Sequence, residues 1–273
     1  MQETIFALDN VHYAYLGKFP ALCGIDMQVK RGEKIAIVGA NGTGKSTLLH
    51  LLDALIFPDK GNIKAFGTEL DEASLNKEEF CKYFRSRVGF IFQNPDVQLF
   101  SPSVKEDIVF GPLQLGLEKE VIKSRLEELT CAFGIEDLLE RPPHRLSTGE
   151  KRKVAIASVL ISEPQVVILD EPTAGLDPAT VRQIIDILIE YNEKGKTIIT
   201  STHDLHIVEE IADTVYLLNK EKKIACSLHP HDLLNNVDLL RENNLIHIHP
   251  HKHKDKIHAH PHLHLGDHHH EEI

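Results

Sequence analysis

Residues 39–47 form a glycine-rich stretch, GANGTGKST, whose residue types and spacing suit phosphate binding. The stretch follows the apolar residues 35–38 and precedes a leucine-rich segment, so the pattern GxxxxGK[ST] stands in the strand–loop–helix context that it requires. Glycines let the backbone wrap around an anion at a helix N-terminus. We expect Lys45 to reach the β- and γ-phosphates of a nucleoside triphosphate and the Ser46 hydroxyl to ligate Mg²⁺. The predicted binding residues are Gly39, Ala40, Asn41, Gly42, Thr43, Gly44, Lys45, Ser46 and Thr47.

A second candidate for nucleotide chemistry is the segment VVILDE at residues 166–171. An apolar run that ends in two carboxylates predicts a buried strand with Asp170 placed for a metal ion. Glu171 would then face a water that attacks the γ-phosphate. A solvated acidic turn after a strand is common by itself, and the glycine-rich loop is what favours the catalytic interpretation.

The composition sets limits on the class of protein. The chain has 273 residues, of which 42% are hydrophobic and 26% charged, enough for one large domain or two small ones. Its formal net charge of -11 argues against binding nucleic acid irrespective of sequence. The four cysteines lack CxxC spacing, which favours a reducing cytoplasm. We find neither a signal peptide nor an apolar run near the roughly 20 residues of a spanning helix, so work at a membrane would need a partner.

An α/β core is expected to position these residues. Short apolar runs predict buried strands at residues 35–38, 166–169, 197–200 and 215–218. Helical spacing lies between them, and Asp177-Pro178 is a suitable start for a helix over residues 181–188. Strands that alternate with helices predict a parallel sheet covered on both faces.

The N-terminal third and the middle of the chain follow other patterns. Strand-like pieces at residues 5–8, 25–29 and 62–66, with hairpin-type turns at residues 30–32 and 59–61, predict an antiparallel β subdomain. Helical spacing without strands predicts a helical subdomain at about residues 103–145. We therefore expect one domain over residues 1–235, followed by a histidine-rich, disordered tail over residues 236–273.

Residues 146–157, LSTGEKRKVAIA, lie between the two nucleotide motifs and resemble the signature of ABC-type ATPases. The rest of that family's motif set has counterparts in order: Gln93 resembles its Q-loop glutamine, Asp177 in AGLD its D-loop aspartate, and His203 its switch histidine. Tyr15 resembles the aromatic residue that stacks on adenine, with Tyr13 as a competing candidate. The resemblance covers residues 1 to about 235 and implies a P-loop NTPase core.

The resemblance also implies that two molecules share each ATP. Lys45 and Ser46 of one subunit and the signature of a second would enclose the nucleotide. Glu171 would act as general base and His203 would hold the γ-phosphate and the attacking water, while Asp170 and Gln93 would support Mg²⁺. The chain carries one complete motif set, so a homodimer is sufficient.

The signature departs from the family pattern, because the usual Ser-Gly-Gly-Gln is here Ser147-Thr148-Gly149-Glu150. A β-branched Thr148 resists positive φ, and Glu150 adds negative charge near the nucleotide interface. Neither change removes the hydrogen-bond donors. The expected effect is slower or weaker use of ATP.

Residues 93–117 and 141–147 resemble the corresponding parts of energy-coupling factor importers, the branch that takes up vitamins and transition-metal ions. In that branch the first segment contacts a coupling helix of a transmembrane subunit, although it must also link the core to the helical subdomain. The implied partners are a transmembrane coupling subunit and a substrate-binding membrane subunit. The chain would lie at the cytoplasmic face of the cell membrane.

The segment from residue 246 to residue 270 carries eleven of the 18 histidines, most of them at alternate positions. In an extended chain a period of two places each set of four on one side, and two prolines keep the segment out of a helix. Neutral imidazole suits Ni²⁺, Co²⁺, Cu²⁺ and Zn²⁺, and the order of affinity favours Ni²⁺ over Co²⁺. The predicted ligands are His247, His249, His251, His253, His258, His260, His262 and His264. A solvated tail without a role is one alternative, and a cloning tag is another, although a tag usually has about six consecutive histidines.

These features predict the ATP-hydrolysing subunit of a nickel or cobalt importer of the energy-coupling factor type. One alternative is the ATPase of a vitamin importer whose tail only buffers metal. Another is a metal store or chaperone whose nucleotide site is regulatory.

Overall fold

The computed structural model describes residues 3–253 and 256–263, and its core is a six-stranded sheet. The strand order is β10-β9-β3-β8-β7-β6, in which β10 is antiparallel to β9 and the other pairs are parallel. The four strands predicted in the core are confirmed. The strands are β3 (Lys34–Val38), β6 (Val88–Ile91), β7 (Val166–Asp170), β8 (Thr197–Thr202), β9 (Thr214–Leu218) and β10 (Ile224–Leu228).

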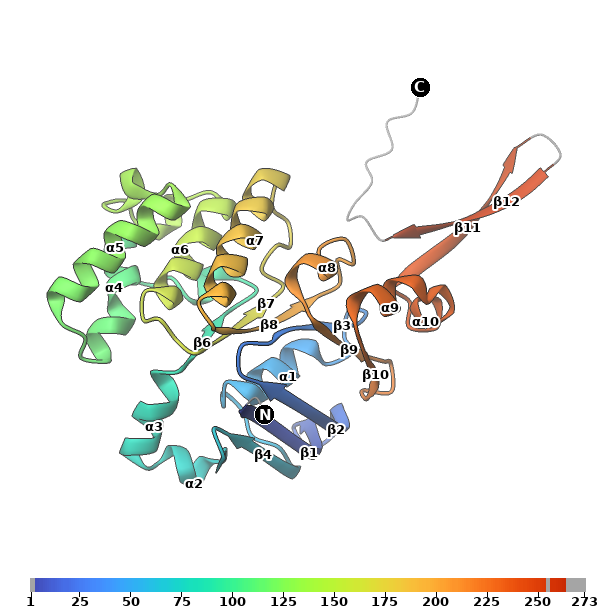
Figure 1. Cartoon of the computed structure of the whole chain (residues 1–273), viewed down its shortest axis with the longest axis horizontal. Coiled ribbons are helices and arrows are strands. Elements are labelled where there is room, and N and C mark those ends of the chain that lie inside the picture. The colour runs from blue at the N-terminus through green and yellow to red at the C-terminus, as the bar shows by residue number, and fades with distance from the viewer. Residues whose placement is uncertain (1–2, 254–255, 264–273) are drawn as a thin grey trace.

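Both faces of this sheet are covered, which explains the uninterrupted apolar runs of its central strands. On one face Ile35 and Ile37 pack with α1 (Lys45–Leu52) and with the strands of a second sheet. On the other face alternate residues pack against α6 (Thr148–Leu160), α7 (Pro178–Glu193) and α8 (Val208–Ile211). Figure 1 shows the helices α6, α7 and α8 grouped on one side of the strands.

The second sheet is antiparallel, as predicted, with the order β2-β1-β4-β5. Its strands are β1 (Thr4–Tyr15), β2 (Phe19–Lys30), β4 (Lys60–Ala65) and β5 (Thr68–Glu69). The hairpin turns predicted at residues 30–32 and 59–61 are wrong. The first turn leads from β2 into β3 of the other sheet, and residues 60 and 61 already belong to β4. Two hairpins form in this sheet: one joins β1 to β2 through residues 16–18, and the other joins β4 to β5 through residues 66 and 67.

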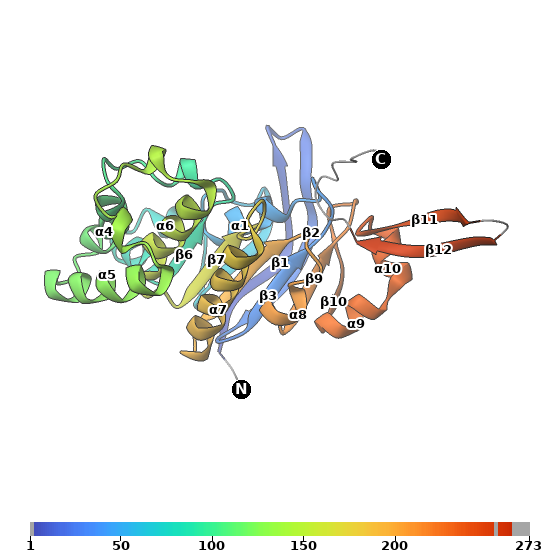
Figure 2. The same ribbon diagram turned by 90° about the horizontal axis from the view of Figure 1, so that it is seen from above.

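A group of helices lies at one end of the molecule (Figures 1 and 2). It contains α4 (Val104–Gln114) and α5 (Lys119–Phe133) together with the short helices η1 (Pro95–Val97), η2 (Glu136–Leu138) and η3 (Pro143–Arg145), and it packs on α6. Ser103 caps α4 by accepting a hydrogen bond from the Glu106 amide at 3.3 Å. Gly134 ends α5 in the left-handed conformation.

The described C-terminal part is more regular than expected. Helices α9 (Pro230–Asn235) and α10 (Val237–Glu242) bury Leu233 and Leu240 against α8 and β9, so the folded core continues past residue 235. Strands β11 (Ile246–His253) and β12 (Lys256–Leu263) then form an antiparallel hairpin, where a disordered tail was predicted. An alternating sequence suits a strand, and this explains the difference. Figure 1 shows the hairpin at the end of the molecule opposite α4 and α5. His264 and the residues after it lie outside the described residues.

A buried carboxylate joins α1 to α3 (Glu78–Arg85), which follows the short helix α2 (Glu72–Leu75). Asp53, at the C-terminus of α1, is buried, and Arg85 donates to its carboxylate at 3.1 Å and to its backbone carbonyl at 2.8 Å. Burial raises the pKa of Asp53 to about 7 and outweighs the opposing effect of Arg85.

This raised pKa makes the free energy of unfolding depend on pH. Between the ordinary pKa of the carboxyl and about 7, the folded protein holds one proton more than the unfolded chain. The contribution of Asp53 to the free energy of unfolding is therefore greatest at low pH and falls as pH rises. The slope is up to about 1.4 kcal/mol per pH unit. We expect Asp53→Asn to remove this slope in chemical unfolding between pH 5 and 7. Glu69→Gln, at an exposed carboxylate, should keep it, and an unchanged slope in Asp53→Asn would contradict the assignment.

Candidate functional site

The glycine-rich loop lies between β3 and α1, where backbone amides and a helix N-terminus face the same space. Gly44 precedes α1 with φ 106°, and a Cβ there would come within 2.4 Å of the Ala21 carbonyl oxygen, so only glycine fits. Lys45 is buried, and its Nζ donates to the Gly39 carbonyl at 2.8 Å. Thr43 donates to the Ala40 carbonyl at 2.9 Å and stabilises the loop from inside.

A cavity of about 510 Å³ opens over this loop. Most of the predicted binding residues line it, and Gly39, Ala40 and Thr43 lie behind its wall, where they support the loop. The complete lining is Tyr15, Phe19, Pro20, Ala21, Asn41, Gly42, Gly44, Lys45, Ser46, Thr47, Gln93, Glu171 and Lys222.

Glu171 is the centre of the polar contacts in the cavity. Its Oε1 lies 3.3 Å from Lys45 Nζ and its Oε2 lies 2.9 Å from Nδ1 of His203, while the side chains of Glu171 and Lys45 are each only 7% exposed. Glu171 has φ 47°, a conformation that costs a non-glycine residue about 1–3 kcal/mol. Hydrogen bonds from its amide to the Ser201 carbonyl (3.2 Å) and hydroxyl (3.0 Å) hold it there. The strain serves to aim the carboxylate at the loop.

Oxygen ligands suitable for Mg²⁺ lie around the same point. The Ser46 hydroxyl and the Gln93 amide line the cavity, and Asp170 is buried at the end of β7, where its Oδ1 accepts from the Ser201 hydroxyl at 2.6 Å. Hydroxyl, amide and carboxylate oxygens are the ligands that Mg²⁺ prefers. The ion, when bound with ATP, would neutralise developing phosphate charge.

Arg152 fixes the position of Gln93, a function that sequence reasoning missed. Its buried guanidinium donates to the Phe92 carbonyl at 2.7 Å and to the Gln93 carbonyl. Arg152 lies on α6, in the segment recognised as the signature, so this helix is tied directly to the residue expected to contact Mg²⁺.

The adenine-stacking candidate can now be placed. Tyr15 is 43% exposed and lines the cavity, and its hydroxyl lies 3.1 Å from the Thr47 hydroxyl. Tyr13 packs on the hydrophobic core and meets Tyr15 edge to face, with ring centroids 5.1 Å apart. The geometry therefore favours Tyr15. Phe19, at the start of β2, lines the same part of the cavity and was not predicted.

The signature residues lie at the N-terminus of α6 and do not line this cavity. Ser147 caps the helix, because its hydroxyl accepts from the Glu150 amide at 3.3 Å while the Glu150 carboxylate accepts from the Ser147 amide at 2.7 Å. These hydrogen bonds keep the pKa of Glu150 below its usual value, so it is charged at neutral pH. The backbone strain expected at Thr148 is absent, because this residue begins α6 and its φ is not positive.

Asp177 also lies outside the cavity and caps α7. Its carboxylate accepts from the Thr180 amide at 3.0 Å and from the Thr180 hydroxyl at 2.6 Å. Gly149 is close to the same Thr180, since a Cβ on it would lie 3.6 Å from the threonine hydroxyl. The signature and the D-loop candidate are therefore neighbours, away from the cavity over the glycine-rich loop.

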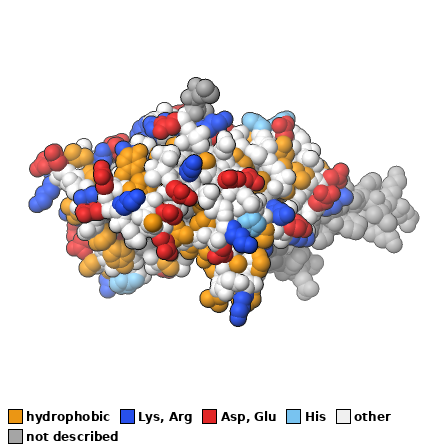
Figure 3. Space-filling view, turned by 90° about the horizontal axis from the view of Figure 1, so that it is seen from below, with side chains coloured by type: hydrophobic (Ala, Val, Ile, Leu, Met, Phe, Trp, Pro, Cys, Tyr) orange, Lys and Arg blue, Asp and Glu red, His pale blue; other side chains and the backbone are white. Residues whose placement is uncertain are grey.

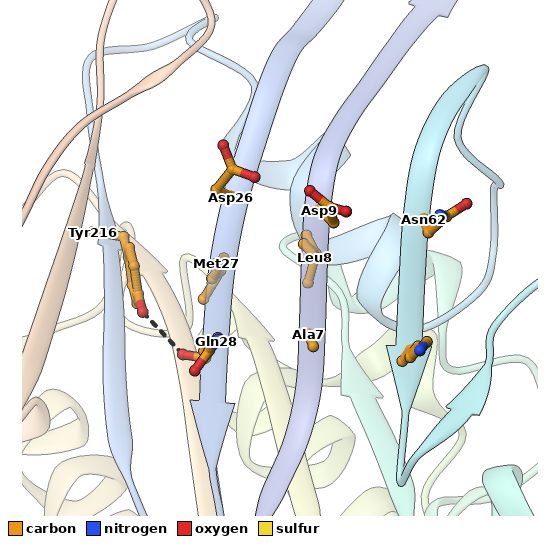
Figure 4. Close-up of a pocket in the computed structure, with 9 residues that line it drawn as sticks. Ala7, Leu8, Asp9, Asp26, Met27, Gln28, Asn62 and Tyr216 are labelled. Atoms are coloured by element: carbon orange, nitrogen blue, oxygen red, sulfur yellow. Dashed lines mark hydrogen bonds between the residues drawn. The ribbon is translucent and has the colours of Figure 1, made fainter.

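A second cavity, of about 630 Å³, lies over β1, β2 and β4 beside Tyr216, whose hydroxyl donates to the Gln28 carbonyl at 2.9 Å (Figure 4). Asp9 and Asp26 line it, and it has neither a glycine loop nor a helix N-terminus. Carboxylates repel a polyphosphate, so the smaller cavity is the better nucleotide site.

Comparison with known proteins agrees with this geometry. Residues 22–174 match the family model described as ABC transporter. A putative ABC transporter ATP-binding protein of Caldanaerobacter subterraneus is 47% identical over 89% of this chain and 100% of its own length. The nickel import ATP-binding protein NikO of Rhodobacter capsulatus is 49% identical over 88% of this chain and 95% of its own.

Solved structures show the same fold. The structure of cbiO1 from Clostridium perfringens, described as part of the ABC transporter complex cbiONQ, has a TM-score of 0.75 at 39% identity and covers 89% of this chain and 96% of its own. A dimeric ATP-binding cassette with bound ADP and Pi has a TM-score of 0.74 at 27% identity, over 83% of this chain and 99% of its own.

The chain belongs to the ABC transporter family. Within it, the chain is an ATP-hydrolysing subunit of the energy-coupling factor type, whose relatives include proteins named for nickel import and for energy-coupling factor transporters.

The contacts of Glu171 predict the effect of removing its basicity. Glu171→Gln keeps the shape of the side chain and the hydrogen bond to His203, so ATP should still bind. The rate of ATP hydrolysis should fall at least about 100-fold, the usual effect of losing a general base. The rate of hydrolysis is measured as phosphate release, and ATP binding is measured as nucleotide affinity. Glu193→Gln, at an exposed carboxylate, is the control. A loss of less than about tenfold would exclude Glu171 as the base.

Proposed function

We propose that the chain energises an importer of nickel or cobalt ions, working as a homodimer beneath a transmembrane coupling subunit and a substrate-binding membrane subunit. ATP hydrolysis is supported by one observation in particular: Glu171 contacts both Lys45 and His203 at the cavity over the glycine-rich loop. The proposed cargo is supported by the histidine-rich hairpin and by the nickel import ATP-binding protein NikO among the similar proteins.

The contacts of Lys45 suggest how ATP starts the reaction. Lys45 contacts the Gly39 carbonyl and the Glu171 carboxylate. The β- and γ-phosphates of ATP would attract Lys45 more strongly and release the Glu171 carboxylate. Glu171 can then take a proton from the attacking water, while His203 holds that water and the γ-phosphate.

A second molecule completes the site. Ser147 and Gly149 lie outside the cavity of their own molecule, so they can contact only the ATP of a partner. The amide groups at the N-terminus of α6 and the outward proton of the Ser147 hydroxyl would face its γ-phosphate. The charged Glu150 weakens the positive end of this helix, and this supports the expected slower or weaker use of ATP.

Exposed aromatic side chains on the helical subdomain supply a surface for the transmembrane partner. Phe100 is 68% exposed and meets Phe110 edge to face at 5.1 Å, with Val97 and Leu113 also exposed. Figure 3 shows hydrophobic side chains at this end of the molecule on one of its faces. Among the described helices, none is long and apolar enough to cross a membrane. An apolar surface of this kind suits the end of a helix from a membrane subunit.

The hairpin arranges the histidines more regularly than an extended tail would. Its register pairs His247 with His262, His249 with His260, and His251 with His258. A sequence with so many histidines supplies imidazole ligands that suit Ni²⁺ or Co²⁺, which supports a transition metal as cargo.

Uptake by cells or vesicles that contain the whole transporter tests the cargo. We expect labelled Ni²⁺ or Co²⁺ to accumulate with ATP, and labelled vitamins not to. Glu171→Gln should abolish the accumulation because it removes hydrolysis. Metal uptake that is unchanged in Glu171→Gln would exclude the proposal, and vitamin uptake would favour an importer whose tail only buffers metal.

Two further variants separate transport from storage. Deleting residues 246–273 should reduce uptake at low metal concentration, while Lys45→Ala should abolish it at every concentration because ATP no longer binds productively. If the deletion abolished function and Lys45→Ala did not, the chain would be a metal store or chaperone with a regulatory nucleotide site.

The partner surface makes a separate prediction. Phe100→Asp places a charge where an apolar contact is expected, so the purified subunit should associate with its membrane subunits at least about tenfold more weakly. ATP hydrolysis by the isolated subunit should stay within about twofold. Co-purification from membranes measures the association. Val237→Asp, at an exposed apolar residue on α10, is the matched control, and equal losses in both variants would contradict the assignment.

A further inference from the structure

The turn between β9 and β10 brings one lysine, Lys222, to the nucleotide cavity. Because β9 runs parallel to β3, both strands end at the same edge of the sheet, where the glycine-rich loop begins. The turn is closed by hydrogen bonds from the Lys222 amide to the Asn219 carbonyl (3.1 Å) and from the Asn219 amide to the Lys223 carbonyl (3.0 Å). The Cys23 amide donates to the Lys222 carbonyl at 2.9 Å and ties the turn to β2.

Lys222 occupies a backbone position that favours glycine. Its φ is 63°, in the left-handed region, where a side chain costs about 1 kcal/mol or more. Strained residues of this kind concentrate at functional sites. Glycine would adopt the same backbone conformation without the strain. The presence of a lysine at this position is therefore explained by its side chain and not by the shape of the turn.

The side chain of Lys222 crosses to the loop that binds phosphate. It is partly buried, lines the cavity, and its Nζ donates to the Gly42 carbonyl. Lys45, the other lysine in the lining, is neutralised by Glu171, whereas no carboxylate among the described residues lies within 4.0 Å of Lys222. Lys222 is therefore the cation of the lining that is available to an anionic ligand.

We propose that Lys222 binds the phosphate chain of the nucleotide, as a second cation opposite the amides of the loop. ATP would take Nζ away from the Gly42 carbonyl, and the lysine would close one side of the cavity. A contact with phosphate does not distinguish adenine from guanine, and it weakens with salt because Lys222 is only partly buried.

Nucleotide affinity of the full chain tests this role. Lys222→Ala should raise the dissociation constants of ATP and GTP by the same factor, about 5- to 20-fold, which is near the lower end for a hydrogen bond to a charged group because solvent screens the partly buried Lys222. The ratio to the wild type should shrink as NaCl increases. In hydrolysis assays KM should rise, while kcat at saturating ATP stays within about twofold. Lys222→Arg should keep most of the affinity.

Matched variants separate charge from backbone strain. Lys220→Ala and Lys223→Ala remove exposed cations from the same turn and should leave affinity unchanged. Lys222→Gly should lose affinity like Lys222→Ala while the nucleotide-free protein melts at the same or a higher temperature, because glycine adopts this φ freely. Unchanged affinity in Lys222→Ala would overturn the proposal. A loss confined to ATP, or restored affinity in Lys222→Gly, would overturn it as well.

Discussion

The buried ion pair between Lys45 and Glu171 joins the two halves of the catalytic site. Lys45 begins the helix after β3, whereas Glu171 follows β7, so the pair forms only when the sheet brings both strand ends to one edge. Between these strands lies β8, which ends beside His203. A buried charge without a partner is costly, so the sheet order and the site chemistry stabilise each other.

The Glu171 carboxylate also has two close partners within its own chain. The same carboxylate that is suited to activate water is occupied by a cation and by an imidazole. In the proposed mechanism phosphate competes for Lys45, and the signature that would complete the enclosure comes from another molecule. Under this proposal both events precede hydrolysis, so a single, unassembled subunit would hydrolyse ATP slowly.

Local sequence patterns predicted much of the fold for physical reasons. Strands buried on both faces are continuous apolar runs in the sequence. The spacing GxxxxGK[ST] between a strand and a helix is specific to a phosphate-binding loop. Turn patterns were less informative. Residues 30–32 form a turn, but their sequence does not indicate that the next strand, β3, belongs to the other sheet. The strain expected at Thr148 depended on a backbone conformation that a helix start does not require. Phe19 and Lys222 reach the cavity only through packing between distant segments, and Lys222 is 180 residues from its partner Gly42.

The left-handed conformation of Glu171 has a consequence for the evolution of such a chain. Glycine at this position would relieve the backbone strain, yet it would remove the side chain that touches both Lys45 and His203 and leave the buried Lys45 without its carboxylate partner. Relief of the strain and loss of the ion pair therefore act in opposite directions on one residue. A descendant that exchanged this glutamate for glycine would gain from the relieved strain only if residue 45 had also lost its charge, so positions 171 and 45 are expected to change together.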